Sequence, residues 1–303
     1  MSLSRYSDLS WDDQHTECLS RLYSLYCDGI FWSDQLLDIG YRGYPDPNYD
    51  LNGTVSPPDF IAYNKDGDVQ HISIINDISQ SDDKEDLIEN RLSEMESYRA
   101  ITEDMINNFL RLRNKSVSVS HQEIVALVPN QSYENYKQKF NTLSDELEVI
   151  LWVIKEDENP EIEKIVGEHA NIELNRQLES GVDVYPDSDD LLYFSRNTDS
   201  SLLEFEFIQR LLTYCARETK RTFEFDEIDE IMVDTRPPML GHIPSEERIE
   251  KWKTYIYRLL NIHKLLDQKG SDVYQWKQKR FISEPRDRKR ILSDLKEELS
   301  PGE

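Results

Sequence analysis

The chain has 303 residues, a length that favours two domains, each large enough to bury a hydrophobic core. Hydrophobic residues make up only 38% of it, yet 10% aromatic residues are too many for a disordered chain, so we expect a folded and very polar protein. No apolar run is long enough to cross a bilayer, and the N-terminus has no basic region followed by an apolar core. We therefore expect a cytoplasmic protein with no membrane partner.

Acidic residues are spread along most of the chain, whose formal net charge is -25 and which contains only 8 Lys before position 251. This pattern resembles proteins of salt-accumulating archaea, and we expect a halophilic host, or a virus or plasmid of one. Basic residues gather instead between Lys251 and Arg290, where 12 Lys and Arg face 4 Asp and Glu, a balance of 12 - 4 = +8. Such a segment indicates either a surface for a polyanion or one that neutralises the protein's own carboxylates.

Helix and strand patterns alternate through the first half of the chain. A helix begins after Ser10, and two strands at 58–63 and 71–75 flank a turn that contains Asp66-Gly67, which is typical of a hairpin. A helix over 84–110, a strand at 124–128, a helix at 133–143 and a strand at 149–154 follow. This order predicts an α/β domain over residues 1–155, with a mixed sheet flanked by helices.

Two motifs lie on these elements. Pro58-Asp59 begins the first hairpin strand, and Glu94 precedes Tyr98 by four residues on the long helix. Together with the element order, they resemble the PD-(D/E)xK nuclease superfamily, which has the restriction-endonuclease-like fold. The resemblance implies that Asp59 binds a metal ion, that Glu17 adds an acidic group from the first helix, and that a Glu-x-Lys motif lies on the second hairpin strand.

The second hairpin strand departs from that motif. Ser73 and Ile75 occupy the Glu and Lys positions, and neither side chain can replace a Mg²⁺ ligand or a lysine that orients water. The sequence therefore predicts a nuclease-like domain that has lost its catalytic set and uses no cofactor. A displaced endonuclease site that binds Mg²⁺ remains the enzymatic alternative. Its candidate residues are Asp59, Glu17, Asp77 and Glu94.

The second half of the chain predicts a mainly α domain. Residues 156–195 are acidic and irregular and are expected to be a linker. Within residues 196–285 we expect helices at 202–217, at 227–232 and from Ser245, closed by a hairpin of strands 265–267 and 273–276. This order resembles a winged helix-turn-helix domain. Residues 286–303 are expected to form a charged tail.

The third helix of this domain predicts a DNA-reading face. Arg248, Lys251, Tyr255 and Arg258 recur on one side of it, which offers cations to phosphates and long donors to base edges. Basic residues in and after the hairpin would extend this surface over the DNA backbone. They are Lys264, Lys269, Lys277, Lys279 and Arg280.

The combined expectation is a double-stranded DNA-binding protein with an inactive nuclease-like domain, of a regulatory kind or from a mobile element or virus. A protein-interaction scaffold is a further alternative, in which the basic surface meets an acidic protein or a second copy of the chain. The three cysteines, Cys18, Cys27 and Cys215, lack metal-ligand spacing and are expected to be free buried thiols.

Overall fold

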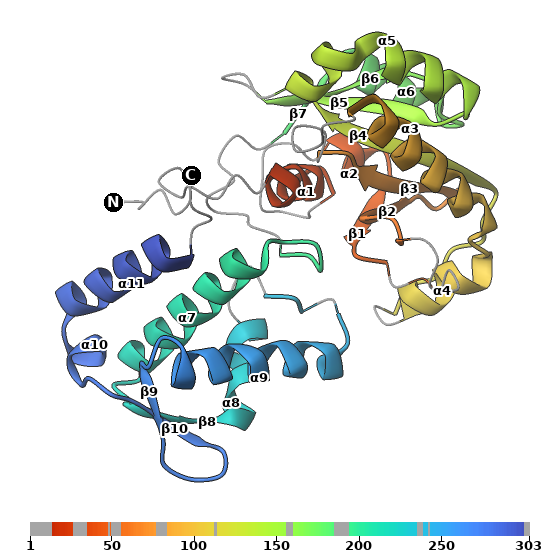
Figure 1. The fold of residues 1–303 in the computed structure, drawn as a ribbon. Coiled ribbons are helices and arrows are strands. Elements are labelled where there is room, and N and C mark those ends of the chain that lie inside the picture. Colours follow the sequence, from red (N-terminus) through yellow and green to blue (C-terminus); the bar gives the residue numbers. More distant parts are fainter. Residues whose placement is uncertain are drawn as a thin grey trace. The chain divides into compact units, whose positions relative to one another are not determined.

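The computed structural model describes residues 14–26, 35–47, 49, 56–76, 84–111, 114–155, 160–184, 194–234, 239–241 and 243–299. They fall into two compact units, one of residues 14–195 and one from residue 196 onward (Figure 1). No helix in the described part of the chain is long and apolar enough to span a membrane. Cys18 and Cys215 are buried free thiols, and Cys27 lies outside the described residues.

Seven strands form one mixed sheet in the N-terminal unit, and they lie in it in chain order. They are β1 (Arg42–Pro45), β2 (Phe60–Tyr63), β3 (Asp68–Ile74), β4 (His121–Pro129), β5 (Ile150–Lys155), β6 (Glu161–Val166) and β7 (Val182–Asp183). β3, β4 and β5 are mutually parallel, and all other neighbours are antiparallel. The parallel strands are joined through helices, as parallel pairs require, so the expected mixed α/β class is confirmed for this unit.

Helices cover both faces of this sheet (Figure 1). They are α1 (Gln14–Ser24), α2 (Gln35–Asp38), α3 (Lys84–Met95), the 3-10 helix η2 (Glu96–Ala100), α4 (Glu103–Arg111), α5 (Asn130–Glu146) and α6 (Ile172–Glu179). α1 and α6 pack on one face, and α3, α4 and α5 pack on the other. Side chains alternate along a strand. Leu127 and Trp152 therefore enter the core beneath α1 and α6, whereas Ala126 and Val153 enter the core beneath α3, α4 and α5.

The predicted hairpin is present. β2 and β3 pair antiparallel, with Phe60 opposite Ile72, and Gly67 takes the positive φ of 90° that the turn requires. The Oδ1 atom of Asn64 accepts hydrogen bonds from the backbone N–H groups of Asp66 and Asp68, both at 3.0 Å. Every residue of β3 is buried, which suits a central strand covered on both faces.

The helix predicted over residues 84–110 is divided into three segments. α3 gives way to η2 at Glu96, and Ile101 is extended, with φ -68° and ψ 121°, before α4 begins. Met95, Tyr98 and Phe109 nevertheless pack into the same core. The break places Tyr98 and Arg99 on a tight turn above the sheet.

The N-terminal unit extends beyond the expected boundary at residue 155. Residues 160–184, predicted to lie in an acidic linker, instead contribute β6, α6 and β7. Lys155 forms ion pairs of 2.8 Å with both Glu161 and Glu163, and Ile162 between them is fully buried. The acidic residues are therefore the outward half of an alternating strand, and a neighbouring strand edge is needed to order it.

The C-terminal unit is mainly helical. It contains α7 (Ser200–Arg217), β8 (Thr222–Glu224), α8 (Phe225–Asp234), α9 (Ser245–Asn261), β9 (Leu266–Gln268), β10 (Val273–Trp276), α10 (Arg280–Ser283) and α11 (Pro285–Leu299). The three strands form an antiparallel sheet in the order β8-β10-β9. Phe207 and Trp252 stack at 5.3 Å in the core, where Trp276 is also fully buried. The expected charged tail holds α11, which contacts α7 and buries Leu295 and Leu299.

Candidate functional site

Asp59 lies just before β2 and is almost fully buried. Its Oδ2 atom accepts a 2.8 Å hydrogen bond from the backbone N–H of Ile74, and its Oδ1 atom is 3.0 Å from Nε2 of His15 on α1. Both carboxylate oxygens are therefore engaged by protein groups. In this position Asp59 ties α1 to the end of β3, and the hydrogen bond from Ile74 gives the carboxylate a structural role.

Two other acidic candidates form ion pairs within their own helices. Glu17 forms an ion pair with Arg21 within α1, and an oxygen of Glu94 is 3.6 Å from Arg91 within α3. Asp77 lies outside the described residues. Among the residues that the structure describes, no group of three or more His, Cys, Asp and Glu is placed to hold a metal ion. The displaced metal site thus gains no support from Glu17 and Glu94.

Ser73 occupies the position of the expected glutamate and bonds to a tyrosine. Its Oγ atom is 2.9 Å from the hydroxyl of Tyr98 on η2. Burial raises the pKa of Tyr98, so its hydroxyl stays protonated and serves as a hydrogen-bonding partner. Ile75 is buried in the apolar core. This end of β3 therefore joins the sheet to η2 through neutral side chains.

Arg248, predicted to face DNA, is buried at 8% exposure. Its Nε and Nη2 atoms donate to the two carboxylate oxygens of Asp229 on α8 at 2.9 and 2.6 Å, and Nη1 donates to the carbonyl of Ile243 at 2.6 Å. The hydrogen bond from Arg248 is the main reason that the pKa of Asp229 lies below its usual value. This fork geometry makes Arg248 part of the packing between α8 and α9.

Two more residues of the expected reading face are engaged inside the C-terminal unit. Tyr255 is 5% exposed, and its ring lies 5.3 Å from Phe207 and 6.1 Å from Trp252. Arg258 donates from Nε to the buried carboxylate of Glu204 on α7 at 2.8 Å. Lys251 is half-exposed. Arg248 and Tyr255 are therefore buried and not displayed on a reading face, whereas Arg258 is partly exposed and held by Glu204.

The buried side of α9 includes two residues of the predicted reading face. The buried residues are Arg248, Trp252, Tyr255, Ile256 and Leu259. A guanidinium group can occupy an inner position when an opposite charge neutralises it, and Asp229 does so here. Helical spacing alone does not reveal such a partner on another helix.

Exposed cations lie instead after the hairpin and on α11. Lys264, just before the hairpin of β9 and β10, is exposed. Lys269, in the turn of that hairpin, is also exposed and lies 3.6 Å from Asp267. Five further cations are exposed and, within the described ranges, form no ion pair. They are named here the basic surface and comprise Lys277, Lys279, Arg280, Arg286 and Lys289.

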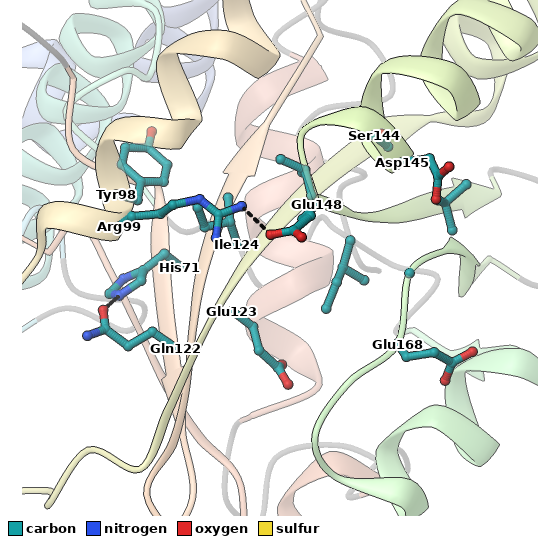
Figure 2. A pocket seen from close by; sticks show the side chains of 14 residues that line it. His71, Tyr98, Arg99, Gln122, Glu123, Ile124, Ser144, Asp145, Glu148 and Glu168 are labelled. Atoms are coloured by element: carbon teal, nitrogen blue, oxygen red, sulfur yellow. Dashed lines mark hydrogen bonds and ion pairs between the residues drawn. The ribbon is translucent and has the colours of Figure 1, made fainter.

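A buried polar network lies in the N-terminal unit and was not predicted. Nδ1 of His169 is 2.6 Å from Glu123, and Nε2 of His169 accepts a 3.0 Å hydrogen bond from the indole of Trp152. Because an indole only donates, the imidazole proton lies on Nδ1. Burial opposes ionisation of Glu123, but hydrogen bonds from His169, the N–H of Ala170 and Gln70 together lower its pKa. The sequence signal for this network was limited to Gln122 and Glu123, two polar residues at the start of the buried strand β4 (Figure 2).

Comparison with protein-family models, with curated proteins and with solved structures gave no significant match.

Proposed function

We propose that this protein binds double-stranded DNA through the basic surface of its C-terminal unit, and that its N-terminal unit is a restriction-endonuclease-like domain without a working metal site. The observation that carries this proposal is the basic surface, whose five cations are exposed and have no ion pair within the described ranges, in a chain whose formal net charge is -25. Exposed cations in an acidic protein raise the local potential and attract phosphates.

The fold supports the assignment of a winged helix-turn-helix to the C-terminal unit. Three helices and a hairpin follow one another in the expected order, and β8 joins the hairpin as a third strand. The exposed side of α9 carries Glu246 and Glu250 beside Lys253, so it offers little attraction to base edges or phosphates. Binding therefore relies on phosphate contacts from the basic surface and has little sequence specificity.

The N-terminal unit supports the nuclease-like assignment through its order of α1, the strands β1 to β3, α3, β4, α5 and β5. Asp59 stands where the family places its metal-binding aspartate, but His15 and the N–H of Ile74 hold its oxygens. Ser73 and Ile75 leave β3 without the carboxylate and the lysine. The protein is therefore expected to retain DNA without cutting it.

The test is fluorescence anisotropy of a labelled duplex with the full chain at several KCl concentrations. Five phosphate contacts predict that log K falls with log[KCl] with a slope of about -4.5. Replacing Lys279, Arg280 and Lys289 together by Ala should reduce that slope to about -2 and weaken binding. The control is Lys253→Ala, an exposed lysine paired with Glu250 at 2.6 Å on α9, which should bind like the wild type.

The same samples, incubated with and without MgCl₂, report strand cleavage. Retention without cleavage is the expected result. Cleavage that disappears in Asp59→Asn would show that the site is active and would overturn the inactive assignment. If the triple variant bound DNA with wild-type affinity, the basic surface would not be the DNA contact. If the wild-type protein retained no DNA at any salt concentration, a protein partner would be favoured instead.

A further inference from the structure

One histidine of the C-terminal unit lies between carboxylates of two helices. His263 lies just beyond the end of α9, and its side chain is only 2% exposed. Nε2 of its ring is 2.8 Å from Oε1 of Glu204 on α7, and Nδ1 is 3.1 Å from Oε1 of Glu298 on α11. The imidazole therefore joins α7 to α11 through its two nitrogens (Figure 1).

The two contacts define the protonation state of His263. An ionised carboxylate only accepts hydrogen bonds, whereas a neutral imidazole has a single N–H to donate. Both contacts therefore form together when each ring nitrogen carries a proton, which makes His263 an imidazolium cation. Loss of one proton must end one of the two hydrogen bonds.

The surroundings of His263 favour the cation. Helix C-termini carry partial negative charge, and His263 lies at the end of α9 while Glu298 lies in the last turn of α11. Arg258 of α9 is the other cation that contacts Glu204, at 2.8 Å. Hydrogen bonding to Glu204 raises the pKa of His263, and Glu298 adds to this rise, whereas burial opposes it.

The two carboxylates differ in how well they tolerate the loss of a donor. The side chain of Glu204 is 3% exposed, and that of Glu298 is 53% exposed. Water can replace His263 at Glu298 but not at Glu204, so the remaining N–H stays on Nε2 with Glu204. A lone pair on Nδ1 then faces the carboxylate of Glu298, and this contact becomes repulsive.

We propose that His263 is a pH-dependent switch for the last turn of α11, which holds Glu298 as the imidazolium and releases it as the neutral ring. The switch changes local order and does not detach the helix, because Leu295 and Leu299 remain buried. The contact is present below the folded pKa of His263 and is lost as pH rises through it. This inference is independent of DNA binding.

The test is native-state hydrogen exchange of the full chain, with protection factors for residues 296–299 corrected for the intrinsic effect of pH. Protection should fall by about fivefold between about pH 6 and about pH 9, as expected for one charge-assisted hydrogen bond. In Glu298→Gln the side-chain amide can accept from a protonated Nδ1 or donate to its lone pair. This variant should therefore have nearly equal protection at both pH values.

The matched control is Glu297→Gln, which removes an exposed carboxylate from the same turn. It should keep the wild-type pH dependence. Wild-type protection that does not change with pH would overturn the proposal. Equal loss of the pH dependence in Glu297→Gln and Glu298→Gln would also overturn it, because the last turn would then respond only to its general negative charge.

The ¹⁵N resonances of the His263 ring identify which contact is released. Both nitrogens should be protonated at about pH 6, and Nδ1 alone should lose its proton by about pH 9. Loss of the proton from Nε2 would show that Glu204 is released instead, and the switch as proposed would be refuted. A ring that is neutral at about pH 6 would refute the bridging imidazolium itself.

Discussion

Single side chains take their roles here from partners far away in the sequence. Arg248 recurs with other basic residues along α9, yet its guanidinium group faces Asp229 on α8. His169 lies in a loop, yet its ring joins Glu123 of β4 to Trp152 of β5. Arg248 and Glu123 are both charged and buried, and each lies against a complementary partner. The interaction with that partner offsets the loss of hydration.

At the scale of residues, Arg248→Ala should lower the free energy of unfolding by about 2 kcal/mol. It removes two hydrogen bonds to Asp229, which keeps the one from the Trp252 indole, and one to the Ile243 carbonyl. The pKa of Asp229 is lowered in the folded state, so this contribution is present above the unfolded pKa of about 4 and is lost as pH falls through the folded pKa. Urea unfolding at pH 7 and pH 3 should show a smaller acid effect in the variant.

The control for this experiment is Lys277→Ala, which removes an exposed cation and should change stability by less than about 0.5 kcal/mol. A variant Arg248→Ala with wild-type stability and lost DNA affinity would contradict the structural role and restore Arg248 to the DNA contact.

Elements of the C-terminal unit meet at His263. This residue follows α9, and its ring lies 2.8 Å from Glu204 of α7 and 3.1 Å from Glu298 of α11. Arg258 also contacts Glu204. The three helices are thus connected through charges around one imidazole whose side chain is only 2% exposed. His263 thus adds a polar contact to the docking of α11, which carries part of the basic surface and also buries Leu295 and Leu299.

Hydrogen bonding to Glu204 raises the pKa of His263 above its usual value, although burial opposes this. The stabilisation is therefore complete below the unfolded pKa of about 6.5 and is lost as pH rises through the folded pKa. Urea unfolding followed by tryptophan fluorescence should show lower stability of the C-terminal unit at pH 9 than at pH 6. His263→Gln should remove this difference, and equal pH dependence in both proteins would refute the proposed connection.

Across the whole molecule, the carboxylates and the basic surface respond to salt in opposite ways. With 60 Asp and Glu against 35 Lys and Arg, the acidic groups repel one another on average, and salt screens that repulsion. The same screening and counterion competition weaken phosphate contacts. Stability and DNA affinity should therefore have opposite salt dependence.

Thermal unfolding of the full chain should move to higher temperature as KCl is raised from about 0.1 M to about 1 M, because the Debye length falls from about 10 Å to about 3 Å. Calorimetry at both salt concentrations measures this. Near pH 4, where many carboxylates are protonated, the salt effect should shrink. A midpoint that falls with KCl at pH 7 would show that attractive ion pairs outweigh the repulsion.

Local sequence patterns were sufficient for the hairpin, the parallel strands β4 and β5, and the helices α7 and α9, because strand and helix periods and turn residues act over a few positions. Tertiary structure alone decided two other features. The acidic stretch around Ile162 became a strand because β5 offers it an edge, and Arg248 became a core residue because Asp229 meets it across 19 residues of chain. Burial and charge pairing depend on segments that fold against each other, which a sequence pattern does not specify.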